Sequence, residues 1–284
     1  MYDVIIIGSG PAGITAGIYL KRAKKNVLII SKGVGALEKA EKIENYYGVE
    51  SISGKELYNI GIKQAKNLDI EIQNDEVTNI SFDKNFIVTT VNNEYESKYV
   101  IIATGTSRKT PNIKGIKEFE GKGVSYCAIC DAFFYRNKDV AVIGNGNYAI
   151  HEANHLKTVA NSVTILTNGK EMVENRSAAE FEIEEAPIRE FRGTNVIEEV
   201  EFDNNNTKKI NGVFIAIGTA SSTDLAKKIG AVVKDNNIVV DENMKTTVEG
   251  LYACGDCTGG VLQVSKAVYD GTKAALAIIK SSST

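Results

Sequence analysis

Several features that would assign this chain to a specialised class are missing from it. Its 284 residues carry 33 basic and 36 acidic side chains, giving a formal net charge of −3. The chain therefore lacks the basic excess with which proteins bind nucleic acid or an anionic membrane surface. Its longest apolar runs, such as VIIIG and YVIIATG, are far shorter than the roughly 20 residues of a membrane-spanning helix. We expect a globular protein with neither nucleic-acid nor membrane partners.

Cysteine and histidine are scarce, with four and two residues. Met1 leads directly into a strand-like pattern, with no basic segment or cleavage site of a secretory signal, so we expect a cytoplasmic protein. Cytoplasmic disulfides are rarely structural, and a cysteine pair there is more often catalytic or metal-bound. The stretch Cys127-Ala-Ile-Cys130-Asp131 contains such a pair. Composition alone leaves open whether it is a metal site, a structural bridge or a redox centre.

The first glycine-rich loop lies within a complete βαβ pattern. Val4 to Ile7 is a continuous apolar run, typical of a strand buried on both faces of a parallel sheet. Gly8, Gly10 and Gly13 then form G-x-G-x-x-G, followed by a helical pattern and by NVLII, which reads as the next strand. Such glycines let the backbone approach a pyrophosphate, which the free N–H groups of the helix N-terminus bind. The pattern predicts a dinucleotide site.

The acidic residue expected after the second strand is replaced by Ser31 and Lys32, so the ribose contact must be made differently or through water. Two later strand patterns complete the same domain. YVIIATGT, at 99–106, ends in Ala-Thr-Gly, and VEGLYACGDCTG, at 248–259, ends in Gly255-Asp256. A carboxylate at a strand's carboxyl end can bind a sugar hydroxyl, and the helix that follows can face an electron-rich ring edge.

The stretch KDVAVIGNGNYAIHEANHLKTVANSVTILTNG repeats the opening pattern. It predicts strands over 140–143 and 162–166, a helix over 147–159, and a glycine loop with Ala149 in third place, an accepted variant. The fold class that follows is α/β, with two Rossmann-like three-layer dinucleotide-binding domains, the second inserted into the first. The split domain is predicted to comprise 1–110 and 247–284, and the inserted domain 111–246. TPNIKG and MKTTVEG would be the two linkers between them.

These motifs resemble those of the two-dinucleotide-domain flavoprotein reductases. With C-x-x-C in the inserted domain, the chain is most similar to the low-molecular-weight thioredoxin reductases, over nearly its whole length, including ENYYG at 44–48 and LQVSKAVYDG at 262–271. The resemblance implies FAD in the split domain, thioredoxin as substrate, and a homodimer. It implies FAD contacts from Gly8, Ser9, Gly10, Pro11, Ala12, Gly13, Ser31, Lys32, Gly35, Ala36, Leu37, Asn45, Ala103, Thr104, Gly105, Gly255, Asp256, Gln263 and Val264.

The resemblance also assigns roles to the C-x-x-C stretch. Cys130 would lie nearest the flavin, and Cys127 would attack the substrate disulfide as a thiolate, whose formation a helix start favours. Asp131 would move the proton as general acid and base, although an aspartate here can equally be a helix N-cap. Because the disulfide must meet first the flavin and then thioredoxin, the inserted domain is expected to rotate about its linkers.

One departure from the family concerns the electron donor. Thioredoxin reductases that use NADPH carry H-R-R-x-x-x-R after the second glycine-loop unit, and those arginines bind the 2′-phosphate. Here Thr167, Asn168, Gly169 and Lys170 stand at that place, followed by Glu171. NADPH binding is therefore doubtful. The chain is most like the ferredoxin-dependent flavin thioredoxin reductases that lack an NADPH site, which implies reduced ferredoxin as donor.

Two alternatives stay open at this point. One is an NADPH-dependent thioredoxin reductase with a degenerate phosphate-binding loop. The other is a flavin redox sensor without turnover, against which the intact C-A-I-C-D stretch argues. Two motifs suggest metals: HEANH at 151–155 fits H-E-x-x-H, and Cys254-Gly-Asp-Cys257 is a second C-x-x-C. Neither has the further ligands or the spacing of a zinc site, so we expect no metal.

Overall fold

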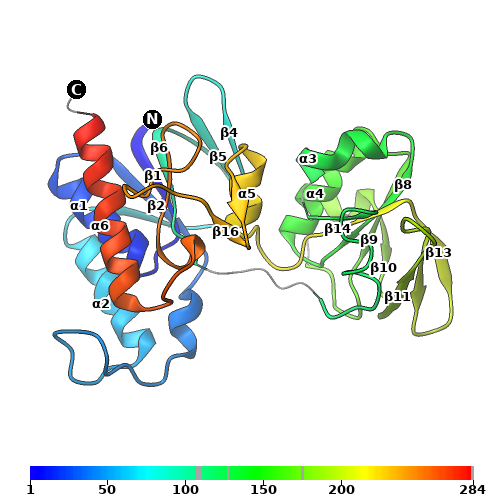
Figure 1. Cartoon of the computed structure of the whole chain (residues 1–284), viewed down its shortest axis with the longest axis horizontal. Coiled ribbons are helices and arrows are strands. Elements are labelled where there is room, and N and C mark those ends of the chain that lie inside the picture. Colours follow the sequence, from blue (N-terminus) through cyan, green and yellow to red (C-terminus); the bar gives the residue numbers. More distant parts are fainter. Residues whose placement is uncertain (106–110, 127, 174–175, 283–284) are drawn as a thin grey trace. The chain divides into compact units, whose positions relative to one another are not determined.

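The computed structural model of the chain describes residues 1–105, 111–126, 128–173 and 176–282. It divides into two compact units (Figure 1). Unit 1 comprises Met1–Ser107 together with Ser221–Thr284, and unit 2 comprises Arg108–Ala220. Each unit is built on its own sheet with a set of parallel strands, as the repeated βαβ pattern predicts. The predicted α/β fold with two Rossmann-like three-layer domains is confirmed.

Unit 1 is built on a seven-stranded sheet of order β3-β2-β1-β6-β5-β4, in which β17 also pairs with β6. Its inner strands are parallel and buried because their Val- and Ile-rich sequences are apolar on both faces. The first half of β6 pairs antiparallel with β5 and its second half parallel with β17. The strands are β1 (Tyr2–Ile7), β2 (Val27–Ser31), β3 (Glu71–Asn74), β4 (Val77–Phe82), β5 (Phe86–Thr90), β6 (Glu94–Ile102) and β17 (Leu251–Ala253).

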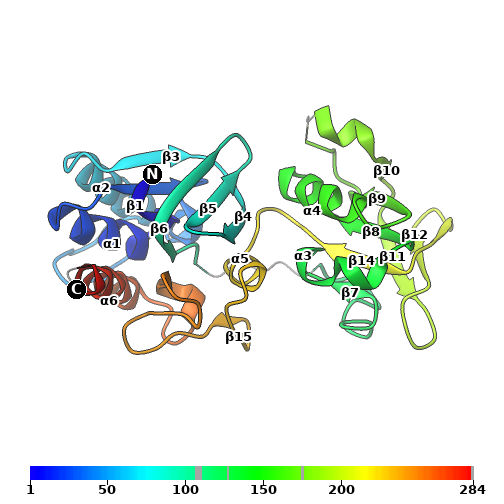
Figure 2. The same ribbon diagram turned by 90° about the horizontal axis from the view of Figure 1, so that it is seen from above.

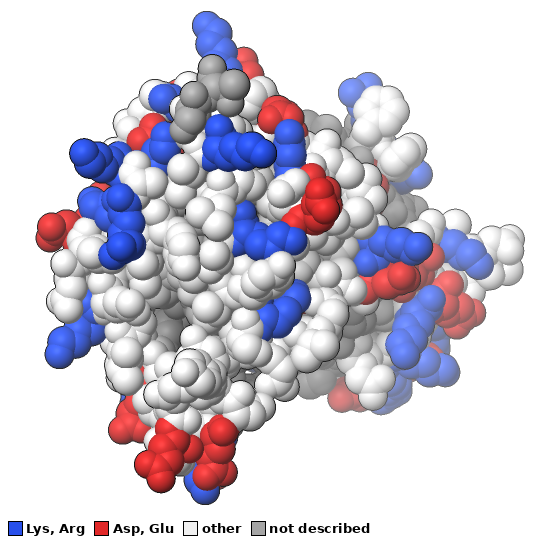
Figure 3. Space-filling model, turned by 60° about the vertical axis from the view of Figure 1, so that its left-hand side comes forward, with Lys and Arg blue, Asp and Glu red and all other residues white. Residues whose placement is uncertain are grey.

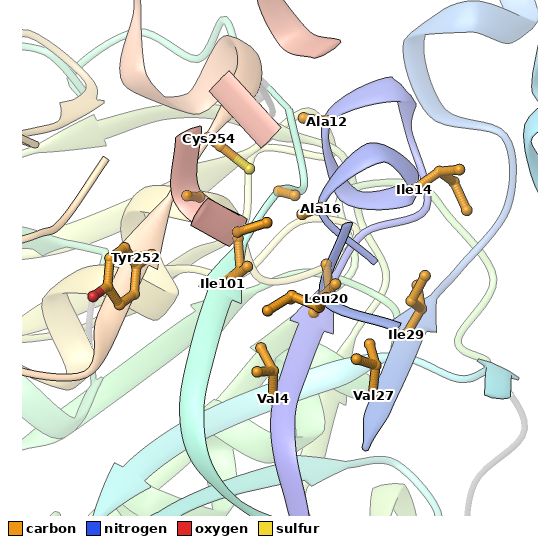
Figure 4. Packing of buried hydrophobic residues seen from close by; sticks show 14 of the residues in the cluster. Val4, Ala12, Ile14, Ala16, Leu20, Val27, Ile29, Ile101, Tyr252 and Cys254 are labelled. Carbon is orange, nitrogen blue, oxygen red and sulfur yellow. The ribbon is translucent and has the colours of Figure 1, made fainter. Parts of the chain in front are cut away.

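Helices α1 (Pro11–Arg22) and α6 (Val264–Ser281) pack side by side on this sheet, with α2 (Gly54–Lys66) next to α1 (Figures 1 and 2). Small residues permit the close α1–α6 contact, since a Cβ added at Gly271 would lie 2.2 Å from the Ala12 carbonyl oxygen. Figure 4 shows Ala12, Ala16 and Leu20 of α1 directed at the strands, where they meet residues such as Ile101. This core fixes the start of α1 against the sheet.

Unit 2 has a five-stranded sheet of order β10-β9-β8-β14-β7 and a three-stranded antiparallel sheet β11-β12-β13. Its strands are β7 (Val124–Ser125), β8 (Asp139–Ile143), β9 (Ser162–Leu166), β10 (Glu182–Glu184), β11 (Ile188–Arg192), β12 (Glu199–Phe202), β13 (Thr207–Lys209) and β14 (Gly212–Ile215). Its helices are α3 (Ala128–Asp131) and α4 (Asn147–Lys157), with 3₁₀ helices η2 (Ala132–Tyr135) and η3 (Arg176–Glu180). The described part of the β9–β10 connection contains η3 but no α-helix.

One predicted boundary is wrong. The sequence analysis placed 221–246 in the inserted domain, whereas the structure places this segment in unit 1. It forms α5 (Ser222–Lys228), β15 (Val233–Lys234) and β16 (Asn237–Ile238). Helix α5 packs on β4, and Lys228 donates a hydrogen bond to the Thr78 carbonyl at 2.8 Å. MKTTVEG is consequently not a linker, since the second crossing between the units lies at 220–221.

Most predicted elements agree with the structure, with ends shifted by a few residues. The last helix begins at Val264, and the strand before it ends at Ala253, where a 3₁₀ helix, η4 (Gly255–Thr258), follows. Among the described residues, no helix has the length and apolar composition required to cross a bilayer. On the face drawn in Figure 3, lysine and arginine side chains stand apart with uncharged surface between them, so this face carries no continuous basic stripe.

Candidate functional site

The predicted cofactor residues of unit 1 converge on one edge of its sheet. Strands β2, β1, β6 and β17 are parallel neighbours whose carboxyl ends are in register: Ile7 pairs with Ile30 and with Ile102, and Ile102 with Ala253. The residues that follow these strands are therefore adjacent in space. They include Gly8–Gly10 after β1, Ser31 at the end of β2, Ala103–Gly105 after β6, and Gly255–Asp256 after β17.

The glycines of the first loop are needed for different structural reasons. Gly8 has φ +111°, and a Cβ there would lie 2.3 Å from the Ala103 carbonyl oxygen. A Cβ at Gly13 would lie 2.0 Å from the Gly8 carbonyl oxygen. Gly10 directly precedes Pro11, the first residue of α1. A Cβ added at Gly10 would meet nothing within 4 Å. Open space therefore lies at the N-terminus of α1, where the first N–H groups have no partner within the helix.

Hydroxyl groups and a lysine occupy the end of β2, where the acidic residue is missing. Ser9 donates a hydrogen bond to Ser31 at 2.6 Å and lies 3.0 Å from the Tyr58 hydroxyl of α2. Lys32 forms an ion pair at 2.5 Å with Glu76, which is 5% exposed and follows the neighbouring strand β3. Sequence reasoning missed Tyr58 and Glu76. The available signal was an acidic residue just past the strand that pairs with β2.

The turn that carries Asp256 is held by α6. The buried carboxylate of Asp270 accepts hydrogen bonds from the Gly255 amide at 3.2 Å and from Lys266 at 2.8 Å. Lys266 also donates to the Gly255 carbonyl at 2.7 Å and to Thr258 at 2.8 Å. Burial raises the pKa of the Asp256 carboxyl, an effect that Lys266 opposes and Asp270 reinforces. The sequence analysis did not identify Lys266 and Asp270, although their i, i+4 spacing on a helix was visible.

Two other predicted cofactor residues meet directly. The Asn45 amide donates a hydrogen bond at 2.9 Å to the side chain of Gln263, which lies 218 positions away and precedes α6. Gly35, Ala36 and Leu37 lie in η1 (Gly35–Lys39), and the Leu37 carbonyl approaches so closely that a Cβ at Gly54 would be 2.0 Å from it. Val264 is the first residue of α6.

The residues at this edge fit a flavin dinucleotide. Space lies open at Gly10 and the N-terminus of α1, as a pyrophosphate requires. The Thr104 hydroxyl is buried and has no hydrogen-bond partner within the described parts of the chain. Buried polar groups normally have partners, so an unpaired hydroxyl at this edge indicates a ligand that is part of the functional protein. Unit 1 thus offers open space for the pyrophosphate of FAD and a buried hydroxyl, that of Thr104, which the cofactor would pair.

The C-x-x-C stretch in unit 2 is described only in part. Cys127 lies outside the described residues, and of Cys130 only the backbone, within α3, is described. Asp131 ends α3 and accepts a hydrogen bond from Ser125 at 2.6 Å. It precedes η2 without capping it through its side chain, so its alternative role as an N-cap has no support here. After it come two exposed aromatic residues, Phe133 (70% exposed) and Phe134 (68%).

The second glycine loop is hydrogen-bonded to the segment that follows β9. As in unit 1, the loop closes on a neighbouring strand, since a Cβ at Gly144 would lie 2.2 Å from the Ala216 carbonyl oxygen. Between the first two glycines, however, the Asn145 side chain donates to the Glu171 carbonyl at 2.8 Å. The Asn145 carbonyl accepts from the Val173 amide at 2.9 Å. The segment after β9 is thereby bonded to the loop residue that would face a dinucleotide.

The arginines of β11 are committed to carboxylates of the small sheet. Arg189 lies 2.9 Å from Glu201, and Arg192 lies 2.7 Å from Glu190 and also contacts Glu201. These contacts use the guanidinium groups for holding β11 to β12. Neither arginine lies within 167–173, directly after β9, where a 2′-phosphate would be bound in an NADPH-dependent relative.

The two motifs that suggest metals are explained by structure. No group of three or more His, Cys, Asp or Glu side chains that could hold a metal is found within the described residues. His151 and His155 of α4 meet each other, with their Nε2 atoms 3.2 Å apart. Cys254 and Cys257 are free, buried thiols, and Cys257 donates to the Cys254 carbonyl at 3.2 Å. Burial raises the pKa of both thiols, that of Cys257 to about 12.

Comparison with known proteins gives the family. Residues 2–271 match the model of the pyridine nucleotide-disulphide oxidoreductases. A thioredoxin reductase of Aquifex aeolicus is 38% identical over 99% of this chain and 93% of its own length. The thioredoxin reductase of Bacillus subtilis is 33% identical, covering 98% and 94%.

Solved structures agree with this result. The atypical thioredoxin reductase TRi of Desulfovibrio vulgaris Hildenborough superposes with a TM-score of 0.93 at 34% identity, covering 99% of both chains. A ferredoxin-flavin thioredoxin reductase of Clostridium acetobutylicum does so with a TM-score of 0.75 at 33% identity, covering 99% of this chain and 98% of its own. The open dinucleotide edge of unit 1, the C-x-x-C stretch of unit 2 and these matches over almost the full length lead to one conclusion: the chain belongs to the pyridine nucleotide-disulphide oxidoreductase family.

Proposed function

We propose that this protein is a flavin-dependent disulfide oxidoreductase that reduces thioredoxin with electrons from reduced ferredoxin. The observation that carries the proposal is the absence of an arginine cluster directly after β9, together with the open edge of unit 1. The N-terminus of α1 is open at Gly10, and residues 167–173, where NADPH-dependent relatives carry their phosphate-binding arginines, include no arginine. These features favour FAD in unit 1 and a donor other than NADPH.

The residues that would hold FAD are those at the edge of the unit 1 sheet. The N-terminus of α1 with Gly10 would take the pyrophosphate, and Asp256 would take a sugar-chain hydroxyl. When bound, FAD supplies a carrier that accepts electrons singly and delivers them in pairs. Lys266 and Asp270 would hold the turn that presents Asp256, and the Asn45–Gln263 hydrogen bond would hold the Asn45 segment to the start of α6.

The dithiol chemistry needs both cysteines of the C-x-x-C stretch. Two electrons and two protons convert the Cys127–Cys130 disulfide into two thiols. The Cys127 thiolate then attacks the thioredoxin disulfide, forming a mixed disulfide and releasing one thiolate of the substrate. Cys130 attacks that mixed disulfide, which releases reduced thioredoxin and restores the Cys127–Cys130 bond. Asp131, oriented by Ser125, would donate and accept the protons.

The donor assignment rests on the missing phosphate clamp. A bidentate arginine on a phosphate provides both strength and geometry, which a single exposed lysine does not replace. Lys170 is exposed, and Glu171 beside it would repel a phosphate. The relative from Clostridium acetobutylicum, named for ferredoxin and flavin, has a similar fold at 33% identity. These points favour ferredoxin over NADPH, which stays the alternative donor.

A docking surface for the substrate follows the redox stretch. Phe133 and Phe134 lie in η2, directly after α3, and expose large apolar side chains. The guanidinium of Arg136 lies 5.3 Å from the Phe133 ring centre. Exposed aromatic pairs beside an arginine are typical of protein-binding hot spots. Their position next to the cysteines suits a protein substrate whose own disulfide must approach Cys127. A redox sensor would not need this surface.

Two further expectations belong to the proposal. A homodimer is supported by the exposed Tyr269 and Leu276, which lie two turns apart on the outer face of α6. We also propose a cytoplasmic location. Sedimentation of the purified flavoprotein would show twice the 30.8 kDa chain mass if it is a dimer and a single chain mass if it is not.

Anaerobic turnover with purified proteins tests the proposed reaction. Photoreduced ferredoxin, the flavoprotein and oxidised thioredoxin are mixed, and new thiols on thioredoxin are counted. The wild-type protein is expected to form two thiols per thioredoxin. Cys127→Ser should accept electrons into the flavin yet form none. Thiol formation by Cys127→Ser at the wild-type rate would contradict the assigned route. A wild-type protein that forms no thiols with either reduced ferredoxin or NADPH would support the sensor instead.

A further inference from the structure

Both histidines of the chain lie together on helix α4 of unit 2. The sequence contains two histidines, His151 and His155, and they are the first and last residues of the H-E-x-x-H motif. Residues four apart on a helix are neighbours on one face. Their rings meet edge to face, with centroids 4.7 Å apart and Nε2 atoms 3.2 Å apart. The function proposed above uses neither of them.

The separation of the two Nε2 atoms matches that of two ligands on one metal ion. Zinc binds imidazole nitrogens at about 2.0–2.1 Å, so two such bonds at a tetrahedral angle place the nitrogens about 3.3 Å apart. Bonds of the same length at the right angle of a square-planar ion place them about 2.9 Å apart. The observed 3.2 Å lies between these two values. The helix thus already holds both nitrogens at the separation that a transition-metal ion requires.

The two rings can reach an ion from solvent. Both histidines are partly exposed, so an ion and its remaining water ligands can approach them. In the contact between the Nε2 atoms one nitrogen donates and the other accepts, so one of them carries a proton. When an ion binds, that proton leaves Nε2 for Nδ1 of the same ring or for solvent, and both nitrogen lone pairs become ligands.

The pair does not make a hydrolytic zinc centre. In a metalloprotease the glutamate of H-E-x-x-H is the general base. Here Glu152 is 1% exposed, and its Oε2 accepts a hydrogen bond at 2.9 Å from the Ala128 amide of α3. Within the described residues no third His, Cys, Asp or Glu completes a group that could hold a metal. Two imidazoles and water would therefore hold the ion, which makes it exchangeable rather than resident.

The charges of α4 permit a cation at this place. Lys157 is the one lysine or arginine in the sequence of α4. Its ammonium group forms an ion pair with Glu180 at 2.7 Å, which offsets its positive charge. The carboxylate of Glu152, between the two histidines in sequence, attracts a cation through the protein. Repulsion from the helix's own side chains thus does not exclude a divalent ion.

We propose that His151 and His155 form a two-imidazole site for one divalent transition-metal ion of the kind that imidazole prefers, such as zinc, nickel or copper. Magnesium and calcium prefer oxygen ligands and would not bind there. An ion that binds the folded chain stabilises it, so the site would link the stability of the protein to the concentration of metal. The inference goes beyond the proposed function and depends on neither the electron donor nor the substrate.

Calorimetric titration with zinc chloride tests this inference. The untagged flavoprotein is used oxidised and without reductant, in a buffer above the usual imidazole pKa of about 6.5, so that thiols and protons compete little with the site. One zinc ion per chain is expected to bind. His151→Gln and His155→Gln should each weaken binding about tenfold or more, because the second ligand of a chelate binds at high effective concentration. Magnesium chloride should give no heat of binding.

A matched control is available on the same turn of α4. Asn154→Gln changes an exposed residue and keeps both imidazoles, so its zinc affinity should equal that of the wild-type protein. Equal zinc affinity in the wild-type protein and in both histidine variants would overturn the inference, because the ion would then lie elsewhere. A wild-type protein that binds no zinc would overturn it too.

A second measurement needs no variant, and it decides if a histidine variant fails to fold. The wild-type protein is treated with diethyl pyrocarbonate, and modification of the peptide that contains both histidines is followed by mass spectrometry. Because the chain has no other histidine, the imidazole signal comes from this pair alone. Saturating zinc should protect both rings from modification, whereas magnesium should not. Equal modification with and without zinc would overturn the inference.

Discussion

At the residue scale, Gly8 and Gly10 allow the pyrophosphate site to be tested without unfolding the protein. Gly10→Ala adds a methyl group into open space, and Gly10 has φ −70°, which alanine adopts without strain. The apoprotein should keep its thermal midpoint, but FAD should bind roughly tenfold or more weakly, because overpacking a site costs about 1–3 kcal/mol. Fluorescence titration of the apoprotein with FAD measures this. Unchanged FAD affinity would show that the pyrophosphate lies elsewhere.

Gly8→Ala is the contrasting variant. Its Cβ would lie 2.3 Å from the Ala103 carbonyl oxygen at a φ of +111°, so the backbone itself must move. We expect a lower thermal midpoint for the apoprotein, in addition to loss of FAD. Equal midpoints for Gly8→Ala and Gly10→Ala would contradict the distinct reasons given for these two glycines.

The buried thiols give a pH prediction at the same scale. Burial raises the pKa of Cys257 to about 12 and that of Cys254 well above its usual value. At pH 8 roughly one thiol in ten thousand would be ionised at Cys257, and only the thiolate reacts. Native protein at pH 8 should therefore be alkylated at neither position, and both should react after denaturation. Because unfolded thiols ionise first, stability should fall as pH rises above about 9. Labelling of Cys257 in the native state would refute its burial.

At the scale of elements, α6 is predicted to hold the cofactor turn through Asp270. Asp270→Ala removes the acceptor of Lys266 and of the Gly255 amide, leaving a partly buried cation without its partner. Breaking such a pair costs about 2–3 kcal/mol after allowance for the partial exposure of Lys266. FAD affinity should drop at least tenfold. Lys280→Ala, an exposed change on the same helix, is the control. Equal FAD affinity in both variants would show that the turn carrying Asp256 does not contribute to the flavin site.

The same scale shows what local patterns can and cannot predict. Strands Val140–Ile143 and Ser162–Leu166 and the helix after each glycine loop were predictable because apolar runs and glycine turns act over short distances. The placement of α5 was not, since its packing on β4 joins segments far apart in sequence. Lys228 and Thr78 lie 150 positions apart, and neither residue type indicates in the sequence that the two will be in contact. For the same reason Glu76 was missed, because its importance depends on its ion pair with Lys32 from another strand.

At the scale of the whole molecule, a protein substrate must find the redox stretch. Phe133→Ala/Phe134→Ala removes side chains that are 70% and 68% exposed, so the fold should be retained. We expect KM for thioredoxin to rise about tenfold or more while reduction of the flavin by its donor stays unchanged, as truncation of hot-spot aromatics predicts. Steady-state kinetics with thioredoxin, beside stopped-flow reduction of the flavin, separates the two. An unchanged KM would place the docking surface elsewhere.

The donor remains the central claim about the whole molecule, and optical reduction under anaerobic conditions tests it most directly. The oxidised flavoprotein is mixed with excess NADPH, with NADH, and with photoreduced ferredoxin, while the visible flavin absorbance is followed. Because residues 167–173, directly after β9, include no arginine to bind a 2′-phosphate, and no carboxylate ends β9 to bind the ribose of NADH, neither nucleotide should bleach the flavin. Reduced ferredoxin should bleach it, and thioredoxin should then restore the colour. Rapid bleaching by NADPH would contradict the account and establish the protein as an ordinary NADPH-dependent reductase.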